Sequence, residues 1–542
     1  MPWSIGLLLA TLPGKQHRLE LLMAEALLCH SGTQTLNLGT GVPMDQIIAG
    51  VDRMGMSTVA LSFSASYPRG PIRSHLVELC DRLPRGVAVW IGAWRSAGVT
   101  RQEPARDARQ PDNREQFEMN DPLLEVQRME EESTTVGEKL ERTHSRAMAT
   151  MSFSLRWQSE NARHTDCLVA NKLNLWRDIL PPEMEPDLMN KPVSHVASHA
   201  FAAGDLLTTY REQDCLRVPR RAFNRNLRKC YIEPRAGRFY PKGFIGGVRG
   251  IFPEDLTPFR VAEVAEDGLT VDLNHPLARH ALDLEARILD IWAGRDEHGG
   301  ACHDVAEMVT ENSPGMQARW RGQETDFFSD IPFARLDPSP DASFYEKPRM
   351  VHHLDATALS QIEGLYRRLL PKGARILDLM SSWTSHLGAD LAPARVTGLG
   401  MNAQELDANP LLSERLVHDL NLDPRLPVPD QAFDAAICTV SVEYLTKPAE
   451  IFAEVCRVLR PGGRFVVTFS DRWFPPKVIK VWQDVHEFER VGLVLEYFLR
   501  DGGFTNLGTW SIRGLPRPDD DKYADRMAHS DPVYAVWGER AS

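Results

Sequence analysis

The sequence predicts a multidomain α/β protein, with α/β sheets near both ends of the chain and a smaller, mostly β module between them. The chain has 542 residues, which is too many for a single hydrophobic core. Segments typical of strands and helices alternate up to about residue 94 and again from residue 355. Short apolar alternations typical of antiparallel strands occupy residues 216–291 instead.

The composition argues against several classes of protein. Hydrophobic residues make up 43% of the chain, and no apolar run approaches the roughly 20 residues of a membrane-spanning helix. The formal net charge of −12 argues against a broad phosphate-binding surface. We therefore expect neither a nucleic-acid partner nor a membrane.

The eight cysteines are scattered, without a CxxC pair, as in reduced cytoplasmic proteins. One group has the residue types of a metal site but no distinctive spacing, namely His298, Cys302, His303 and Asp304. A polar loop is the commoner explanation for such a segment, so we expect no metal.

Residues 1–98 are predicted to form a parallel α/β domain. Four apolar runs have the length of strands, at residues 4–12, 33–39, 58–64 and 87–93. Helical patterns separate these runs, including one near Asp45 to Met54, and this order favours a parallel sheet.

The central part of the chain is predicted to contain a linker, a β module and a connecting segment. Residues 99–180 are rich in charge and proline at their start and are predicted to be a linker. Residues 181–296 include FRVAEVAEDGLTVDLN and ALDLEARILDI, which alternate as antiparallel strands do. Residues 297–354 are expected to connect this module to the next domain.

Residues 355–542 are predicted to form a second parallel α/β domain. Asp355 is expected to cap its first helix, whose apolar positions are Leu359, Ile362, Tyr366 and Leu369. The run ARILDL then brings Asp378 to the carboxyl end of a buried strand, the edge where open α/β sheets bind ligands. Pro448 suits the first position of a later helix.

The order of motifs in this domain resembles that of the class I S-adenosylmethionine-dependent methyltransferases. The motifs are ARILDLMSSW, ARVTGLGMN, HDLNLD, the FD pair at residues 433–434 and the PGG turn at residues 461–463. The resemblance implies a Rossmann-like fold and S-adenosylmethionine as cofactor. It also implies that Asp378 lies near the methionine and ribose of the cofactor, and that Asp419 and Leu420 contact the adenine.

Two positions depart from that family. Its first motif has a glycine-rich turn, where this chain has Met380, Ser382 and Thr384. Its second strand ends in an acidic residue, where this chain has Gly400, so Asn402 is the expected partner of the ribose hydroxyls. The candidate cofactor-binding residues here are Asp378, Met380, Ser381, Ser382, Asn402, Asp419, Leu420 and Ser441. The alternative is a doubly wound sheet without a ligand.

The candidate catalytic residues follow the fourth strand of this domain. Methyl transfer depends largely on aligning the acceptor with the methyl donor, so few acids or bases are obligatory. Ser441, Glu443 and Tyr444 stand where substrate and cofactor would meet, and we predict that Glu443 and Tyr444 are catalytic. A solvated loop in which Tyr444 packs is the alternative. The acceptor is expected to be an unidentified small molecule or protein.

The N-terminal segment LPGKQHRLELLMAEALLCHSGTQTLNLGTGVP resembles the cobalamin-binding domains of MerR-type regulators. The resemblance implies a flavodoxin-like fold and a cobalt ligand at His17, since imidazole is a common metal ligand. Lys15 stands where that family has an aspartate that holds the imidazole. A vestigial or protein-docking domain is the alternative to cobalamin binding.

The middle segment resembles the flap and last strand of SlyD-like FKBP-type prolyl isomerases. The run VDLNHPLA carries most of this resemblance, which implies a peptide-binding or structural module at Asn274, His275 and Pro276. The same NHP sequence is also a good turn. The sequence thus favours a methyltransferase of unknown acceptor. A noncatalytic sensor or scaffold and a SlyD-like folding helper are the other classes.

Overall fold

The computed structural model describes residues 6–10, 34–39, 42, 44–56, 58–63, 79, 82–84, 87–93, 138–227, 230–294, 302–310 and 314–542. The chain divides into two compact units. The first comprises residues 1–138 with 293–302, and the second comprises residues 139–292 with 303–542. The predicted β module and the predicted C-terminal domain therefore belong to one unit.

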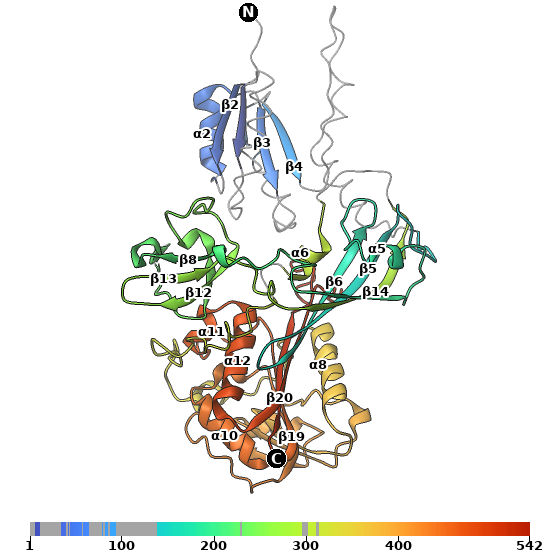
Figure 1. Cartoon of the computed structure of the whole chain (residues 1–542), viewed down its shortest axis with the longest axis vertical. Helices are drawn as coiled ribbons and strands as arrows, with labels where there is room; N and C mark the ends of the chain where they lie inside the picture. Colours follow the sequence, from blue (N-terminus) through green and yellow to red (C-terminus); the bar gives the residue numbers. More distant parts are fainter. Residues whose placement is uncertain are drawn as a thin grey trace, which may run out of the picture. The chain divides into compact units, whose positions relative to one another are not determined.

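The first unit contains a four-stranded parallel sheet in the order β2-β1-β3-β4 (Figure 1). Its elements are β1 (Gly6–Ala10), β2 (Gln34–Gly39), α2 (Met44–Met54), β3 (Thr58–Phe63) and β4 (Ala88–Ala93). Leu8, Val59 and Leu61 of the strands pack with Ile47 and Val51 of the helix. The structure thus confirms the parallel α/β sheet and the helix near Asp45.

The second unit is built on an eleven-stranded sheet, in the order β17-β16-β15-β18-β19-β21-β20-β6-β5-β14-β7. The first seven strands in this order come from the C-terminal part of the chain. They are β15 (Arg375–Leu379), β16 (Arg395–Gly400), β17 (Glu414–Val417), β18 (Phe433–Thr439), β19 (Leu459–Phe469), β20 (Phe504–Arg513) and β21 (Val533–Arg540). Strands β15 to β19 are parallel, and β21 runs antiparallel between β19 and β20.

Helices cover both faces of this part of the sheet. They are α8 (Ala356–Leu369), α9 (Ala403–Ala408), α10 (Pro448–Val458), α11 (Lys480–Asp484) and α12 (Glu487–Asp501). Each face of the sheet has its own hydrophobic core, and successive residues of β15 point to opposite faces. Ile376 packs with residues of α8 on one face, while Leu377 and Leu379 pack with residues of α10 and α12 on the other. Asp355 accepts a hydrogen bond from the Ala358 amide (3.1 Å), which confirms the predicted cap of α8.

Four further strands extend the sheet beyond β20. They are β5 (Met148–Gln158), β6 (Arg163–Asn174), β7 (Val196–Phe201) and β14 (Leu282–Trp292). β6 pairs in parallel with β20, although about 340 residues separate them, as the register Ser511 to Asp166 shows. The predicted linker, residues 99–180, therefore differs from the structure over β5 and β6. Apolar residues alternate with polar ones along MATMSFSLRWQ, which is the sequence signal for β5, and the charged, proline-rich stretch before it favoured a linker instead.

A smaller antiparallel sheet lies beside the large one, in the order β11-β12-β13-β8. Its strands are β8 (Cys215–Val218), β11 (Phe239–Pro241), β12 (Pro258–Val264) and β13 (Leu269–Asp272). The antiparallel strands expected in residues 216–291 are confirmed, but β14 joins the large sheet instead of the small one. The remaining short elements are α5 (Glu185–Leu188), α6 (Val305–Thr310), α7 (Asp341–Phe344), β9 (Asn226–Leu227) and β10 (Cys230–Tyr231).

A buried polar network joins the added strands to the C-terminal domain. Asp166 on β6 accepts hydrogen bonds from Trp157 Nε1 (2.8 Å) and from Ser511 Oγ on β20 (2.8 Å). Gln317 Nε2 donates to the same carboxyl group at 3.2 Å. Burial raises the pKa of Asp166, and these hydrogen bonds oppose the rise. The network therefore satisfies a carboxyl group that would otherwise be costly to bury.

No helix among the residues that the structure describes is both long and apolar enough to cross a membrane.

Candidate functional site

The candidate site lies at the carboxyl edge of the parallel strands β15, β16 and β18. Asp378, the fourth residue of β15, is 2% exposed and pairs in register with Gly398 and Ile437. Its carboxyl group accepts a hydrogen bond from Ser381 Oγ at 2.6 Å. Burial raises the pKa of Asp378 to about 6, against the effect of hydrogen bonds from Ser381 and Ser385. The structure thus brings together two of the predicted cofactor-binding residues, Asp378 and Ser381.

The turn after β15 adopts a glycine-like backbone without a glycine. Met380 has a φ of +58°, in the left-handed region that non-glycine residues rarely occupy. The next amide, that of Ser381, donates to the carbonyl of Leu399 on β16 at 2.8 Å. The turn is therefore tied to the neighbouring strand.

This close approach explains the glycine at the end of β16. A Cβ atom on Gly400 would lie 2.2 Å from the carbonyl oxygen of Ser381. Any side chain at this position would displace the turn, so the acidic residue of related sites has no room here. The glycine in place of an acid at the end of β16 and the turn at Met380 and Ser381 therefore depend on each other.

Asn402 caps α9, and its amide group is fully engaged within the chain. Its Oδ1 accepts from the amides of Gln404 (3.0 Å) and Glu405 (3.1 Å). Its Nδ2 donates to the carbonyls of Tyr345 (2.9 Å) and Glu346 (3.0 Å). A ribose hydroxyl would have to replace one of these partners.

Two other predicted cofactor-binding residues form hydrogen bonds within the chain, and a third is buried in the hydrophobic core. Ser382 Oγ donates to Glu405 Oε2 at 2.7 Å. Asp419 Oδ1 accepts from the amides of Asn421 (2.9 Å) and Leu422 (3.2 Å), which holds the turn after β17. Leu420 is buried in the core on the α10 side of the sheet.

The three predicted residues after β18 lie around a short 3₁₀ turn, η5 (Val442–Tyr444). Ser441 precedes it and donates from Oγ to the Thr439 carbonyl at 2.9 Å. Tyr444 is buried, and its hydroxyl accepts a hydrogen bond from the Phe474 amide at 2.8 Å. Tyr444 is therefore packed and held in place, as the alternative to a catalytic role also expected, and its catalytic role stays a prediction.

Glu443 is the most unusual group at this edge. Its side chain is 1% exposed, and neither carboxyl oxygen accepts a hydrogen bond from another residue in the described part of the chain. Burial raises the pKa of Glu443 to about 8, while its own backbone amide and the charge of Arg490 oppose the rise. A buried carboxyl group without a partner is costly and is typical of functional sites.

A segment that the sequence predicted only as a connection packs over this edge. Arg335 pairs with Asp341 at 2.6 Å and also donates to the carbonyl of Tyr444 at 2.6 Å. Lys477, with a fully buried side chain, pairs with Asp337 at 3.0 Å and donates to the Ser339 carbonyl at 2.7 Å. The contacts of Arg335 with Tyr444 and of Lys477 with Asp337 and Ser339 join residues more than 100 positions apart, and no local sequence pattern indicates them.

Aromatic rings from the same segment complete the edge. Phe344 and His353 both make edge contacts with Phe474, with ring centroids 5.7 and 4.9 Å apart. Trp383 of the DLMSSW motif packs against His352, with the two ring centroids 4.5 Å apart. Such faces can stack on planar groups, so the edge combines buried acids with aromatic surfaces.

The buried acids at this edge fit a cationic cofactor. Neither Asp378 nor Glu443 forms an ion pair with a Lys or Arg side chain in the described residues, and burial raises both pKa values. A cation bound beside either carboxylate would favour its ionised form and lower its pKa. S-adenosylmethionine carries a sulfonium and an ammonium group, so the residues present fit this cofactor.

The match to a family model defines the class of the C-terminal region. Residues 350–467 match the model described as a methyltransferase domain. The open sheet with a parallel β17-β16-β15-β18-β19 core, helices on both faces and an acid at the end of β15 agrees with that match. The C-terminal region therefore contains a class I S-adenosylmethionine-dependent methyltransferase domain with a Rossmann-like fold.

The curated relatives that match include several ubiquinone/menaquinone biosynthesis C-methyltransferases and a malonyl-[acyl-carrier protein] O-methyltransferase. The ubiquinone/menaquinone biosynthesis C-methyltransferase UbiE of Laribacter hongkongensis is 28% identical over 153 residues, which is 28% of this chain and 60% of that protein. UbiE of Paraburkholderia xenovorans is 34% identical over 110 residues, 20% and 44% of the two chains. The demethylmenaquinone methyltransferase of Lactiplantibacillus plantarum is 32% identical over 124 residues, 21% and 52%. The chain spans about half the length of these relatives.

Solved structures of methyltransferases also match. The S-adenosylmethionine-dependent methyltransferase from Mesorhizobium loti is 19% identical, with a TM-score of 0.24, and covers 33% of this chain and 96% of its own. That from Aquifex aeolicus is 16% identical, with a TM-score of 0.23, and covers 37% and 97%.

The sequence also singled out a cobalt ligand and a possible metal-binding group. His17, the predicted cobalt ligand, lies outside the described residues, as does His298. His303 and Asp304 are described, and the His303 amide donates to Asp178 at 3.1 Å. Among the residues that the structure describes, no group of three or more His, Cys, Asp or Glu residues is placed to hold a metal.

Proposed function

We propose that this protein is an S-adenosylmethionine-dependent methyltransferase, like the UbiE proteins that it resembles over part of its length. The observation that carries the proposal is the match of residues 350–467 to a methyltransferase domain. Asp378 at the end of β15 supports it, because it is a buried acid that forms no ion pair with a Lys or Arg side chain in the described residues and so suits a cationic cofactor. When bound, S-adenosylmethionine supplies an electrophilic methyl group.

We assign the methionine end of the cofactor to Asp378 and Ser381, with Met380 and Ser382 supplying the backbone of the turn. The family resemblance assigns the adenine to the turn at Asp419 and Leu420. The Asn402 side-chain amide donates both of its hydrogen bonds to the carbonyls of residues 345–346. Asn402 can therefore bind the ribose of the cofactor only if these hydrogen bonds break. The carbonyls of residues 345–346 therefore compete with the ribose for the Asn402 amide.

Glu443 and Tyr444 are assigned to the acceptor side of the site, next to Ser441. With a pKa near 8, Glu443 is mostly protonated at neutral pH and can donate a hydrogen bond to an acceptor oxygen. Tyr444 offers a ring held by the Phe474 amide. The names of the UbiE relatives, which read ubiquinone/menaquinone biosynthesis C-methyltransferase, make a small aromatic acceptor the first to test.

Calorimetric titration of S-adenosylmethionine into the full chain tests this proposal. The full chain is needed because an isolated C-terminal fragment would expose the edge of β20 that pairs with β6. Asp378→Asn keeps the shape of the side chain and removes its charge, and Asp407→Asn is the matched control because Asp407 is exposed on α9. We expect saturable binding that weakens about tenfold or more in Asp378→Asn and is unchanged in the control.

A folded full chain that binds no S-adenosylmethionine would overturn the proposal and favour a scaffold instead. The commitment of Asn402 within the chain and the absence of room for an acid at Gly400 favour that second candidate. Binding without methylation of a small quinol-like or protein acceptor would favour a sensor.

We propose residues 1–98 as a separate regulatory module that binds cobalamin through His17, on the strength of its family resemblance. The order β2-β1-β3-β4 supports this, since flavodoxin-like sheets begin in the same way. Absorption spectra of the full chain with added cobalamin, beside His17→Ala, test the assignment. A peptide-binding role for residues 181–296 likewise remains a proposal from resemblance, tested by prolyl isomerase assays.

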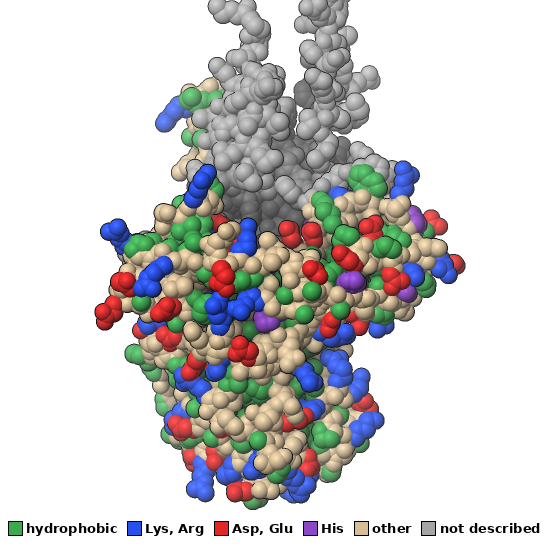
Figure 2. Space-filling view, in the orientation of Figure 1, with side chains coloured by type: hydrophobic (Ala, Val, Ile, Leu, Met, Phe, Trp, Pro, Cys, Tyr) green, Lys and Arg blue, Asp and Glu red, His purple; other side chains and the backbone are tan. Residues whose placement is uncertain are grey.

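We also propose a cytoplasmic protein whose methyl acceptor is a small molecule or a protein rather than nucleic acid. On the face shown in Figure 2, basic and acidic side chains are interspersed, which supports a partner other than nucleic acid. Five of the described cysteines are free, as in a reducing compartment, namely Cys167, Cys215, Cys302, Cys438 and Cys456.

A further inference from the structure

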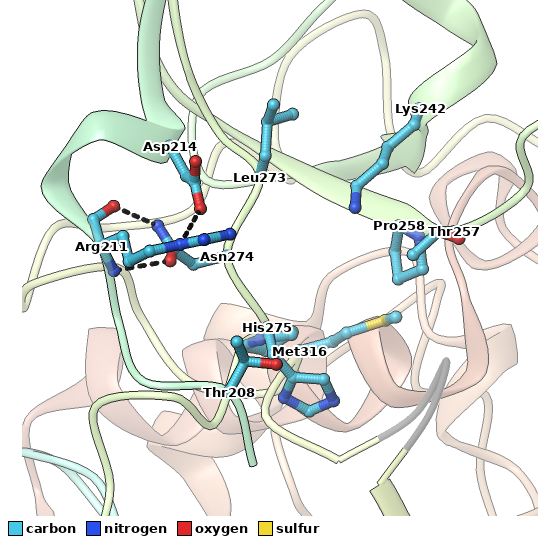
Figure 3. A pocket seen from close by; sticks show the side chains of 11 residues that line it. Thr208, Arg211, Asp214, Lys242, Thr257, Pro258, Leu273, Asn274, His275 and Met316 are labelled. Carbon is cyan, nitrogen blue, oxygen red and sulfur yellow. Dashed lines mark hydrogen bonds and ion pairs between the residues drawn. The ribbon is translucent and has the colours of Figure 1, made fainter. Parts of the chain in front are cut away.

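A pocket of about 250 Å³ lies next to the small antiparallel sheet (Figure 3). None of its lining residues belongs to the candidate methyl-transfer site. The pocket is formed where the turn after β13 meets the segment before β8 and the start of β12. Asn274, His275 and Pro276 of the VDLNHPLA run all line it.

One wall of the pocket is apolar. Leu273 and Pro276 come from the turn after β13, Pro258 from the start of β12, and Met316 from the connecting segment. Leu273 lines the pocket and is only partly buried, and it also packs against the core of the small sheet. A wall of this kind favours the hydrocarbon part of a small molecule.

Most of the polar groups around the pocket are already satisfied. Asn274 Oδ1 accepts from the Arg211 amide (2.9 Å), and its Nδ2 donates to the Arg211 carbonyl (3.0 Å). The Arg211 guanidinium pairs with Asp214 at 2.8 Å. His275 Nε2 is bonded to the Thr310 carbonyl, and burial lowers the pKa of this histidine to about 4, so the ring is neutral. These groups leave no net charge on the wall.

Lys242 is the exception. No hydrogen bond or ion pair to its Nζ atom is formed within the described part of the chain, and Figure 3 shows the amine directed into the pocket. Its charge reaches His275, where it contributes to the lowered pKa. Lys242 begins a short 3₁₀ turn, residues 242–244, that packs closely against the backbone of Pro253. A Cβ atom on Gly243 would lie 2.4 Å from the Pro253 carbonyl oxygen. The pocket therefore presents one uncompensated positive charge beside an apolar wall.

We propose that this pocket binds a small organic carboxylate. The carboxylate pairs with Lys242, and the hydrocarbon body of the ligand packs against Leu273, Pro258 and Met316. A charge-assisted hydrogen bond to an ammonium group is strong enough to select anions from neutral isosteres. The pocket volume suits a ligand of about the size of benzoate. The proposal is independent of methyl transfer.

Titration of benzoate into the full chain, followed by calorimetry, tests the proposal. Benzamide has nearly the same shape without the charge, and inorganic phosphate has charge without the apolar body. Lys242→Met keeps the hydrocarbon stem and removes the amine, and Lys372→Met at an exposed position is the matched control. Leu273→Trp places a larger side chain at the pocket wall, and Leu273 is chosen because it is only partly buried, so the chain should still fold.

We expect saturable benzoate binding that is at least about tenfold weaker in Lys242→Met and in Leu273→Trp, and unchanged in Lys372→Met. Benzamide should bind at least about tenfold more weakly than benzoate, and phosphate should not compete with it. Equal binding of benzoate to Lys242→Met and to the native chain would overturn the proposal. Absence of saturable binding to the native chain, or phosphate binding as tight as benzoate, would overturn it as well.

Discussion

Replacing Glu443 by Gln should remove a pH-dependent cost from folding. The carboxyl group is 1% exposed and receives no hydrogen bond from another residue in the described part of the chain. Glutamine has almost the same shape but cannot ionise. The substitution therefore isolates the cost of the charge from the cost of the packing.

The direction and size of the effect follow from the pKa values. Burial raises the pKa of Glu443 from 4.5 to about 8, so between these pH values the folded chain holds a proton that the unfolded chain releases. The contribution of this group to stability is fully present below pH 4.5 and is lost as the pH rises towards 8. Each pH unit in that window costs up to about 1.4 kcal/mol, which amounts to roughly 4 kcal/mol between pH 5 and pH 8.

Thermal unfolding of the full chain between pH 5 and pH 9 measures this effect. The melting temperature of Glu443→Gln relative to the native chain should increase by several degrees between pH 5 and pH 8 and then level off. Glu450→Gln, at an exposed position on α10, controls for the loss of a carboxyl group and should give no such trend. A constant difference between native and Glu443→Gln chains across the whole range would refute the reasoning.

Three other substitutions test the packing around the site and the sheet junction by thermal or urea unfolding of the full chain. Gly400→Ala should lower the free energy of unfolding by about 1–3 kcal/mol, because its Cβ atom would lie 2.2 Å from the Ser381 carbonyl; an unchanged midpoint would show that the turn yields freely. Lys477→Met should cost about 1–3 kcal/mol, because it removes a buried amine that pairs with buried Asp341 and donates to the Ser339 carbonyl, and a stability gain would contradict this. Trp157→Phe should cost about 1–3 kcal/mol through the lost hydrogen bond to buried Asp166; a neutral effect would mean that water replaces the indole.

Local signals in the sequence were sufficient for much of the C-terminal domain. Asp355 caps α8, and Pro448 opens α10, as their positions predicted. The apolar run before Asp378 forms a buried strand, and the acid lies at its carboxyl end. Each of these features depends on a few neighbouring residues, and such short-range preferences are visible without knowledge of the fold.

The same reasoning was weaker where a strand joins a sheet from far away. The alternation along β5 and β6 was present in the sequence, but the proline-rich, charged stretch before it favoured a linker over the whole of residues 99–180. The partner of β6 is β20, and nothing in either segment indicates the other. Pairing across such a separation is set by which sheet edge is left open after the domain folds.

The sequence by itself thus determined the Rossmann-like class of the C-terminal domain, the order of its first elements and the acid at the end of β15. Only the tertiary structure decided how the site residues are used. It engaged Asn402 with the segment at residues 345–346, left Glu443 without a hydrogen-bonding partner, and excluded every side chain from position 400. The physical reason is range: strands, helices and caps depend on neighbours along the chain, whereas burial, hydrogen-bond partners and pKa values depend on neighbours in space.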